Sequence, residues 1–121
     1  MDEHRLDIDL DTLQSLERRL PLDDIFDVLS DDCARYTLYC LDDQPTIALE
    51  QLADVVAGMR ATATDTVTTP SEHERIRIRL YHVSLPKLES LEFIEYDVDT
   101  RMVTRANVPP DVYELLDIDQ S

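Results

Sequence analysis

Basic side chains gather in the second half of the sequence, at spacings that suit contact with phosphate groups and with the edges of DNA bases. Six of the eleven basic residues follow Ser71. Arg75, Arg79 and His82 recur at i, i+4 and i+7, so one stripe of a helix would carry all three. A guanidinium binds phosphate and can donate two parallel hydrogen bonds to guanine. We therefore expect a DNA-binding helix here, and weigh it against a solvated surface on which arginines pair with neighbouring acids.

Catalytic and metal-binding chemistry is not expected. Gly58 is the single glycine, which excludes glycine-rich phosphate loops, dinucleotide-binding loops and the hydrolase nucleophile elbow. The three histidines are scattered, and no Cys-x-x-Cys or His-x-x-x-His spacing occurs. Cys33 and Cys40 would lie about 10 Å apart on one helix, too far for a disulfide bond, and we expect two core thiols. We predict no enzyme activity, no metal and no cofactor.

The charge balance is strongly acidic. The chain has 27 Asp and Glu residues against 11 Lys and Arg, a net charge of −16, and Lys87 is the single lysine. An excess of Asp over Glu and of Arg over Lys along the whole chain indicates adaptation to molar salt. In molar salt most of the non-specific affinity for DNA is lost. The repulsion between an acidic protein surface and DNA is also weak there, because charges are screened within about 3 Å. We expect a halophilic, cytoplasmic protein without a membrane span, because no long apolar run and no signal peptide is visible.

Helical periodicity dominates the N-terminal third of the chain. Five leucines at helical spacing mark residues 6–20, which form either a dimerisation helix or a helix laid on its own domain. A second amphipathic helix is expected over 22–29. Asp31 or Asp32 can cap a third helix that runs to about Leu41. This third helix is apolar around most of its circumference, which is typical of a helix at the centre of a small domain.

The middle of the chain predicts a helix followed by a loop. Residues 46–48 form one turn or a short strand, and an amphipathic helix begins at Leu49 and ends near Gly58. Residues 61–71 are rich in threonine and lack an apolar period, which indicates a loop. A loop from 60 to 71 is far longer than the turn of a tight helix-turn-helix, so the helices on either side would be less rigidly coupled.

The segment from Glu74 to Leu80 alternates strictly between polar and apolar residues, as a strand would. We favour a helix over 72–91, because Ser71 and Glu74 have the spacing of a capping box and no turn residues interrupt the segment. Pro86 is expected to kink this helix, since a proline removes a hydrogen bond. One side of the helix is expected to face the core, and it carries Ile76, Leu80, Val83 and Leu91.

A hairpin and a last helix complete the chain. Residues 93–97 and 102–105 predict two strands, with Asp99 and Thr100 at the turn. This turn lacks the glycine that hairpins prefer, so either Arg101 adopts a strained conformation, at a cost of about 1 kcal/mol, or the tip of the hairpin is longer. An arginine at such a tip can also contact a phosphate or the minor groove. Residues 111–118 predict a closing amphipathic helix.

Helix, short strand, helix, helix and a two-stranded hairpin is the element order of a winged helix-turn-helix, a mainly α fold with a small β-hairpin wing. In that fold the second helix of the motif lies in the major groove and the hairpin touches the DNA backbone. We expect an N-terminal helical extension over 1–20, the winged-helix domain over 21–106 and a C-terminal helix over 107–121. The recognition helix would be 72–91 and the wing 93–105.

Four segments and a short strand resemble a haloarchaeal family of winged-helix domains of unknown function, near the ArsR-like transcriptional regulators. The segments are LDDIFDVLS (22–30), RYTLYCL (35–41), LEQLAD (49–54) and IRLYHVSLPKLE (78–89), followed by IEYD (94–97). The resemblance covers about residues 22–105, and HVSLPKL is its most specific run. What it implies is a DNA-binding regulator.

The expected function is therefore a sequence-specific DNA-binding transcriptional regulator of a halophilic archaeon. It would bind double-stranded DNA as a homodimer, through the leucine stripe of 6–20 or the helix after Pro110, because such regulators commonly bind paired half-sites. The alternative is a winged-helix protein–protein interaction module that does not bind DNA. The candidate DNA-binding residues are Arg75, Arg77, Arg79, His82, Lys87, Arg101 and Arg105.

Overall fold

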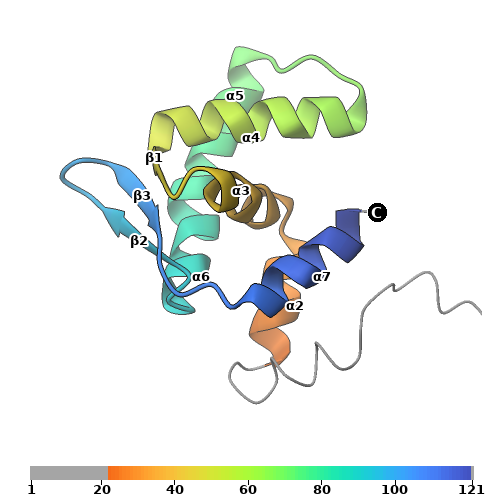
Figure 1. Ribbon diagram of the computed structural model, residues 1–121. Coiled ribbons are helices and arrows are strands. Elements are labelled where there is room, and N and C mark those ends of the chain that lie inside the picture. Colours follow the sequence, from red (N-terminus) through yellow and green to blue (C-terminus); the bar gives the residue numbers. More distant parts are fainter. Residues whose placement is uncertain (1–21, 121) are drawn as a thin grey trace, which may run out of the picture.

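The elements expected after residue 21 appear in the expected order. The computed structural model of the protein describes residues 22–120, and it is mainly helical with a small antiparallel sheet (Figure 1). The elements are α2 (Leu22–Ser30), α3 (Asp32–Asp43), β1 (Thr46–Ala48), α4 (Leu49–Thr64), α5 (Pro70–Arg79), η2 (Leu80–Ser84), α6 (Leu85–Ser90), β2 (Ile94–Asp97), β3 (Met102–Arg105) and α7 (Pro110–Gln120). Element η2 is a π-helical turn inside the long helix that runs from α5 to α6.

Helix α3 occupies the middle of the fold, as its apolar circumference predicts. Figure 1 shows α4 above it, the hairpin projecting on one side and α7 on the other. The side chains of Cys33 and Leu38 are completely buried, and the second thiol, Cys40, is half-buried. Asp31 is the residue that caps this helix, because its Oδ1 accepts hydrogen bonds from the backbone N–H groups of Cys33 and Ala34, at 3.0 and 3.3 Å.

Residues 46–48 form a strand rather than a turn. The sheet order is β1-β3-β2 and both pairings are antiparallel, with Ile47 opposite Val103 in one and Tyr96 opposite Val103 in the other. Ile47 and Val103 are buried. The backbone N–H of Leu49 donates to the carbonyl of Arg101 at 2.9 Å, so the start of α4 is joined to the tip of the hairpin.

The predicted end of α4 near Gly58 and the predicted loop of 61–71 are wrong. The helix continues to Thr64 and ends at Asp65, which adopts a left-handed conformation with φ 55°. Two threonine hydroxyls bond back to helix carbonyls, Thr62 to Gly58 at 2.9 Å and Thr64 to Arg60 at 3.0 Å. These bonds satisfy hydroxyl groups that would otherwise favour a turn. The connection to α5 is therefore short, and the two helices are more closely coupled than predicted.

The long helix predicted over 72–91 is confirmed as a continuous run from α5 to α6, with a different cap. Thr69, and not Ser71, caps α5 by accepting the N–H of Glu72 at 3.1 Å. The predicted disturbance from Pro86 takes the form of the π turn η2, in which the N–H of Leu85 donates to the carbonyl of Leu80. A proline cannot donate and its ring crowds the carbonyl four residues earlier, so a wider turn before it relieves both problems.

The π turn also changes which residues face the core. Four residues of the long helix, each four positions after the last, are buried: Ile76, Leu80, Ser84 and Leu88. They stay on one side of the helix because the π turn holds more residues than an α turn. Val83 was expected in the core and is 39% exposed, so that prediction is wrong, and Leu91 is only half-buried. The prediction assumed 3.6 residues per turn throughout, whereas the π turn contains about one residue more.

Helix α7 covers the protein's own core. Val112, Leu115 and Leu116 are buried, and the hydroxyl of Tyr39 on α3 donates to the carbonyl of Leu116. The expectation that this helix offers a free apolar face for dimerisation is thus corrected, because that face is already covered by α3. The predicted leucine stripe of residues 6–20 lies outside the described residues.

Candidate nucleic-acid interface

A cleft opens between the long helix and the hairpin. It has a volume of about 300 Å³, and it is lined by Leu49, Arg77, Tyr81, Tyr96, Val98 and Arg101. The two tyrosine rings meet edge to face, with centroids 5.9 Å apart and an interplanar angle of 74°. Arginines beside aromatic rings can bind a phosphodiester backbone and stack on or flank bases.

Arg101 stands at the tip of the hairpin in a strained conformation, one of the two possibilities that the missing glycine left open. Its φ is 60°, and its N–H donates to the carbonyl of Asp97 at 2.7 Å. The Asp97 side chain stabilises the same turn, since Oδ1 accepts from the N–H groups of Asp99 and Thr100. Within residues 22–120 the Arg101 guanidinium forms no ion pair, so it is available to an anion that enters the cleft.

Arg77 lies on the opposite wall of the cleft and already has carboxylate partners. Its Nη2 lies 2.5 Å from Oε2 of Glu74, and its Nη1 lies 3.9 Å from Oε2 of Glu50. The hydrogen bond that Arg77 donates to the Glu74 carboxylate raises the pKa of Arg77. Both carboxylates are exposed, so a phosphate oxygen could replace either of them as a partner without breaking a buried contact.

Arg79 and Lys87 point to a different place, the junction of α2 and α3. Oδ2 of Asp31 lies 3.4 Å from Nη2 of Arg79 and 3.2 Å from Nζ of Lys87, and it accepts the Ser84 hydroxyl at 3.1 Å. Lys87 also lies 3.2 Å from Asp27 on α2. Donors from α5, η2 and α6 therefore converge on one carboxylate that is only 3% exposed. This convergence attaches the long helix to the α2–α3 junction.

The environment of Asp31 keeps it ionised. Burial alone would raise its pKa, but the hydrogen bonds from Lys87 and from the N–H of Ala34, with the charges of Lys87 and Arg79, lower the pKa below its ordinary value. The sequence indicated the capping role of Asp31 and missed this second role. The signal was absent from local spacing, because Ser84 and Lys87 lie 53 and 56 residues away.

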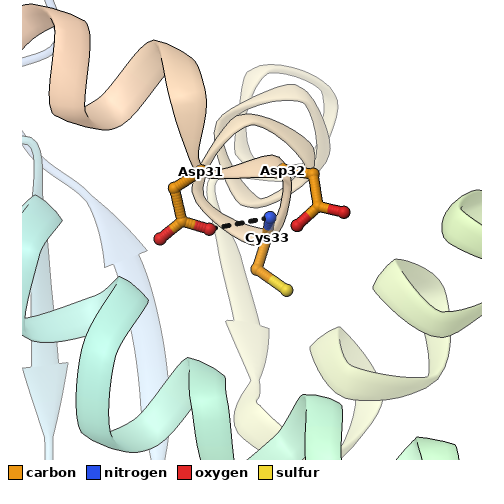
Figure 2. Close-up of side chains that lie close together, drawn as sticks. All are labelled: Asp31, Asp32 and Cys33. Carbon is orange, nitrogen blue, oxygen red and sulfur yellow. Dashed lines mark hydrogen bonds between the residues drawn. The ribbon is translucent and has the colours of Figure 1, made fainter.

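Asp31, Asp32 and Cys33 bring possible metal ligands together at the first turn of α3. One ligand atom from each lies within 4.8 Å of the others. Figure 2 shows the two carboxylates on either side of Cys33, and the Asp31 carboxylate accepts a hydrogen bond from the backbone nitrogen of Cys33. Asp32 instead lies 3.2 Å from Nε of Arg60. Burial, followed by the charges of Asp32 and Asp31, raises the pKa of the Cys33 thiol to about 11, so it is protonated at neutral pH. The geometry is that of a helix cap.

The remaining candidate residues lie away from the cleft. Arg75 is exposed and lines a second cavity between α4 and α5, whereas Nη1 of Arg105 lies 3.7 Å from Oδ1 of Asp42. His82 is exposed, and its ring meets the edge of the Tyr81 ring with centroids 4.8 Å apart. The structure thus brings Arg77 and Arg101 to one cleft and disperses the others. Contact of the seven residues with DNA stays a prediction.

Apolar side chains are exposed on the long helix, and the sequence analysis overlooked them. Ile78 is 46% exposed, Tyr81 42% and Val83 39%. The signal for Ile78 was present, because a strict alternation of isoleucine and arginine cannot bury both isoleucines on one side of a helix. Exposed apolar side chains beside arginines suit contact with thymine methyl groups or with a protein surface.

Comparison with known proteins gives one match. A family model described as Domain of unknown function (DUF7344) matches residues 26–104, from the middle of α2 to the penultimate residue of β3. This segment includes the cleft, the buried Asp31 and all of the sheet except Arg105. Neither the curated proteins nor the solved structures contain a match to the chain.

Proposed function

The chain belongs to the DUF7344 family, whose description assigns no function, and we propose from the geometry that it is a winged helix-turn-helix domain that binds double-stranded DNA. The element order α3, β1, α4, long helix, β2, β3 supports this fold, as does the pairing of β1 with β3 beside the hairpin. The run from α5 to α6 would be the recognition helix and the hairpin β2–β3 the wing.

The observation that carries the proposal is the cleft between these two elements. Arg77 and Tyr81 line it from the long helix, and Tyr96 and Arg101 line it from the hairpin. A phosphodiester strand in this cleft would receive charge-assisted hydrogen bonds from both guanidiniums, with Arg77 exchanging Glu74 for a phosphate oxygen. The exposed Ile78 would then be placed to contact a thymine methyl group in the major groove.

The acidic composition is compatible with this function only in high salt. At low salt a net charge of −16 repels DNA, whereas at about 1 M salt repulsion is screened within about 3 Å. The proposal therefore includes a halophilic host, of the haloarchaeal kind that the sequence resembles, and a cytoplasmic regulator of transcription. It also includes a homodimer. Within the described residues, no helix is both long and apolar enough to span a membrane.

Fluorescence anisotropy with a labelled duplex, selected from random sequence by the protein itself, tests the proposal in molar KCl. Arg101→Gln removes the guanidinium at the tip of the hairpin. We expect this variant to bind all DNA sequences more weakly, and the slope of log affinity against log salt concentration to be smaller by about one. Arg60→Gln is the matched control, since it removes the same charge outside the cleft from an arginine that is not among the seven candidate residues. Equal affinities for the two variants, or no duplex binding by the folded parent protein, would refute the cleft as a DNA site.

A protein-docking module is the second candidate function. The exposed Ile78, Tyr81 and Val83 favour it, because apolar side chains of this size on one helix are typical of protein contacts. The pairing of Arg79, Lys87 and Arg105 with carboxylates favours it as well. The same anisotropy titration separates the two functions. If the protein unfolds cooperatively in a thermal melt in molar KCl but binds no duplex, the docking module is the better account.

A further inference from the structure

A second cavity lies between α4 and α5, away from the cleft. Its volume is about 350 Å³, and we call it the α4–α5 pocket. It is lined by Ala57, Arg60, Ala61, Thr64, Thr66, Thr68, Glu72, Arg75 and Ile76. This volume is within the range of small-molecule sites, which begins at about 300 Å³. The proposed function does not use this pocket.

Two arginines, Arg60 and Arg75, line the pocket in a chain that has few basic residues. Arg60 uses Nε for Asp32 at 3.2 Å, which leaves the two Nη groups of its fork for another partner. Arg75 forms no ion pair with any described residue, although acids outnumber bases 27 to 11. The first turn of α5 adds a partial positive charge, because Thr69 caps this helix beside the lining residues Thr68 and Glu72.

The pocket also offers hydrogen-bond acceptors. The Thr68 hydroxyl donates to the carbonyl of Ala57 at 3.1 Å, and the Thr64 hydroxyl donates to the backbone carbonyl of Arg60 at 3.0 Å and lies 2.8 Å from that of Thr66. Because these protons are engaged, these lining threonines can offer a ligand mainly acceptor oxygens, as can the lining Glu72 carboxylate. A ligand that fits must therefore combine an anionic group with hydroxyl donors.

We propose that the α4–α5 pocket binds a small phosphate ester that carries hydroxyl groups, such as a sugar phosphate. The phosphate would lie between the guanidiniums of Arg60 and Arg75, where each can donate two hydrogen bonds to its oxygens. The hydroxyls of the ligand would donate to the threonine oxygens and to Glu72. Such a ligand bridges α4 and α5 across the short connection between them, so it would stabilise the relative position of these two helices.

The test is an NMR titration of the full chain with inorganic phosphate, then with ribose 5-phosphate, at constant ionic strength in KCl and without DNA. We expect saturable shifts of the amide signals of Thr64, Thr66 and Thr68, and tighter binding of the sugar phosphate. Arg75→Gln should weaken both by at least about fivefold, because one charge-assisted pair is lost. Arg101→Gln, which removes the same charge outside the pocket, should leave the affinity for these two ligands within twofold.

Three results would overturn the proposal. The first is a set of amide shifts that do not saturate or that centre outside the pocket. The second is an equal loss of phosphate affinity in Arg75→Gln and Arg101→Gln, which would indicate general charge attraction. The third comes from adding an unlabelled duplex to the phosphate-free protein. If the duplex shifts the same threonine signals and Arg75→Gln removes that effect, the phosphate belongs to a DNA backbone and not to a small ligand. Failure of the duplex to bind at all leaves the phosphate titration unaffected, so the two proposals are tested separately.

Discussion

Replacing Asp31 by alanine should cost more stability than any other single change of a charged residue described above. Its carboxylate is 3% exposed and accepts from the backbone of Cys33 and Ala34 and from the side chains of Ser84 and Lys87. It joins three segments that are separate in sequence, and Asp31→Ala removes all of these acceptors at once.

The magnitude follows from the groups left behind. Loss of the N-cap of α3 costs about 1 kcal/mol. The Ser84 hydroxyl is completely buried, and without an acceptor it costs about 1–3 kcal/mol more. Lys87 keeps Asp27 as a partner, and Arg79 is 44% exposed and can be solvated, so these cations add little. We expect the free energy of unfolding to fall by about 3 kcal/mol. This is a large share of the total stability of a native protein, which is usually about 5–15 kcal/mol.

The dependence on pH gives an independent check. The folded-state pKa of Asp31 is lower than its ordinary value of 3.8, so its contribution is fully present above that value. The contribution disappears as pH falls through the lowered pKa of the folded state. The difference in stability between the parent protein and Asp31→Ala should therefore be constant at neutral pH and shrink in acid below about pH 4.

Urea denaturation followed by circular dichroism at fixed KCl measures both effects. Asp32→Ala is the matched control, because it removes the neighbouring carboxylate, whose partner Arg60 is 45% exposed. The control should lose less than about 1 kcal/mol, as is usual for exposed ion pairs. If Asp31→Ala unfolds at the same urea concentration as Asp32→Ala, the convergence on Asp31 contributes nothing and the reasoning fails.

Three further predictions concern the hairpin, the salt dependence and the thiol. Arg101→Gly should raise the free energy of unfolding by about 1 kcal/mol in a thermal melt, because glycine adopts φ 60° without strain; a lower melting temperature would contradict the strained turn. The melting temperature of the parent should fall as KCl is lowered towards about 0.1 M, since the Debye length there is about 10 Å and the net charge of −16 repels itself; a flat series would contradict halophilic adaptation. Cys33, with its pKa raised to about 11, should react with iodoacetamide at pH 8 far more slowly than the unfolded chain, and equal rates would contradict its burial.

Most of the elements could be predicted from the sequence. An apolar circumference indicated α3, amphipathic spacing from Leu49 indicated the start of α4, and a capping-box spacing without turn residues indicated the long helix. The turn without glycine left a strained Arg101 as one of two possibilities. The same reasoning ended α4 too early because threonine is a weak helix former in isolation. Here the hydroxyls of Thr62 and Thr64 bond to the helix itself, which no propensity value describes.

The candidate site was harder to predict, because it depends on contacts between distant segments. The sequence placed arginines on the long helix and did not show that Arg79 would turn to Asp31 while Arg77 turned to the hairpin. Tyr81 and Tyr96 meet only when β2 packs beside the helix, and neither belongs to a local motif. Charge counting predicted one basic surface, whereas side-chain partners divide it into separate regions.

The π turn gives the long helix two independent registers. Residues before Leu80 and residues after Ser84 are offset from each other by about one extra position, because a π turn holds one more residue than an α turn. Removing one residue between 80 and 84 would restore a regular α-helix and leave the orientation of α5 relative to α6 nearly unchanged, because an α turn completes the same rotation with one residue fewer. A single deletion could therefore remove an exposed side chain between Tyr81 and Val83 from the outer surface while Ile76 and Leu88 keep their places in the core.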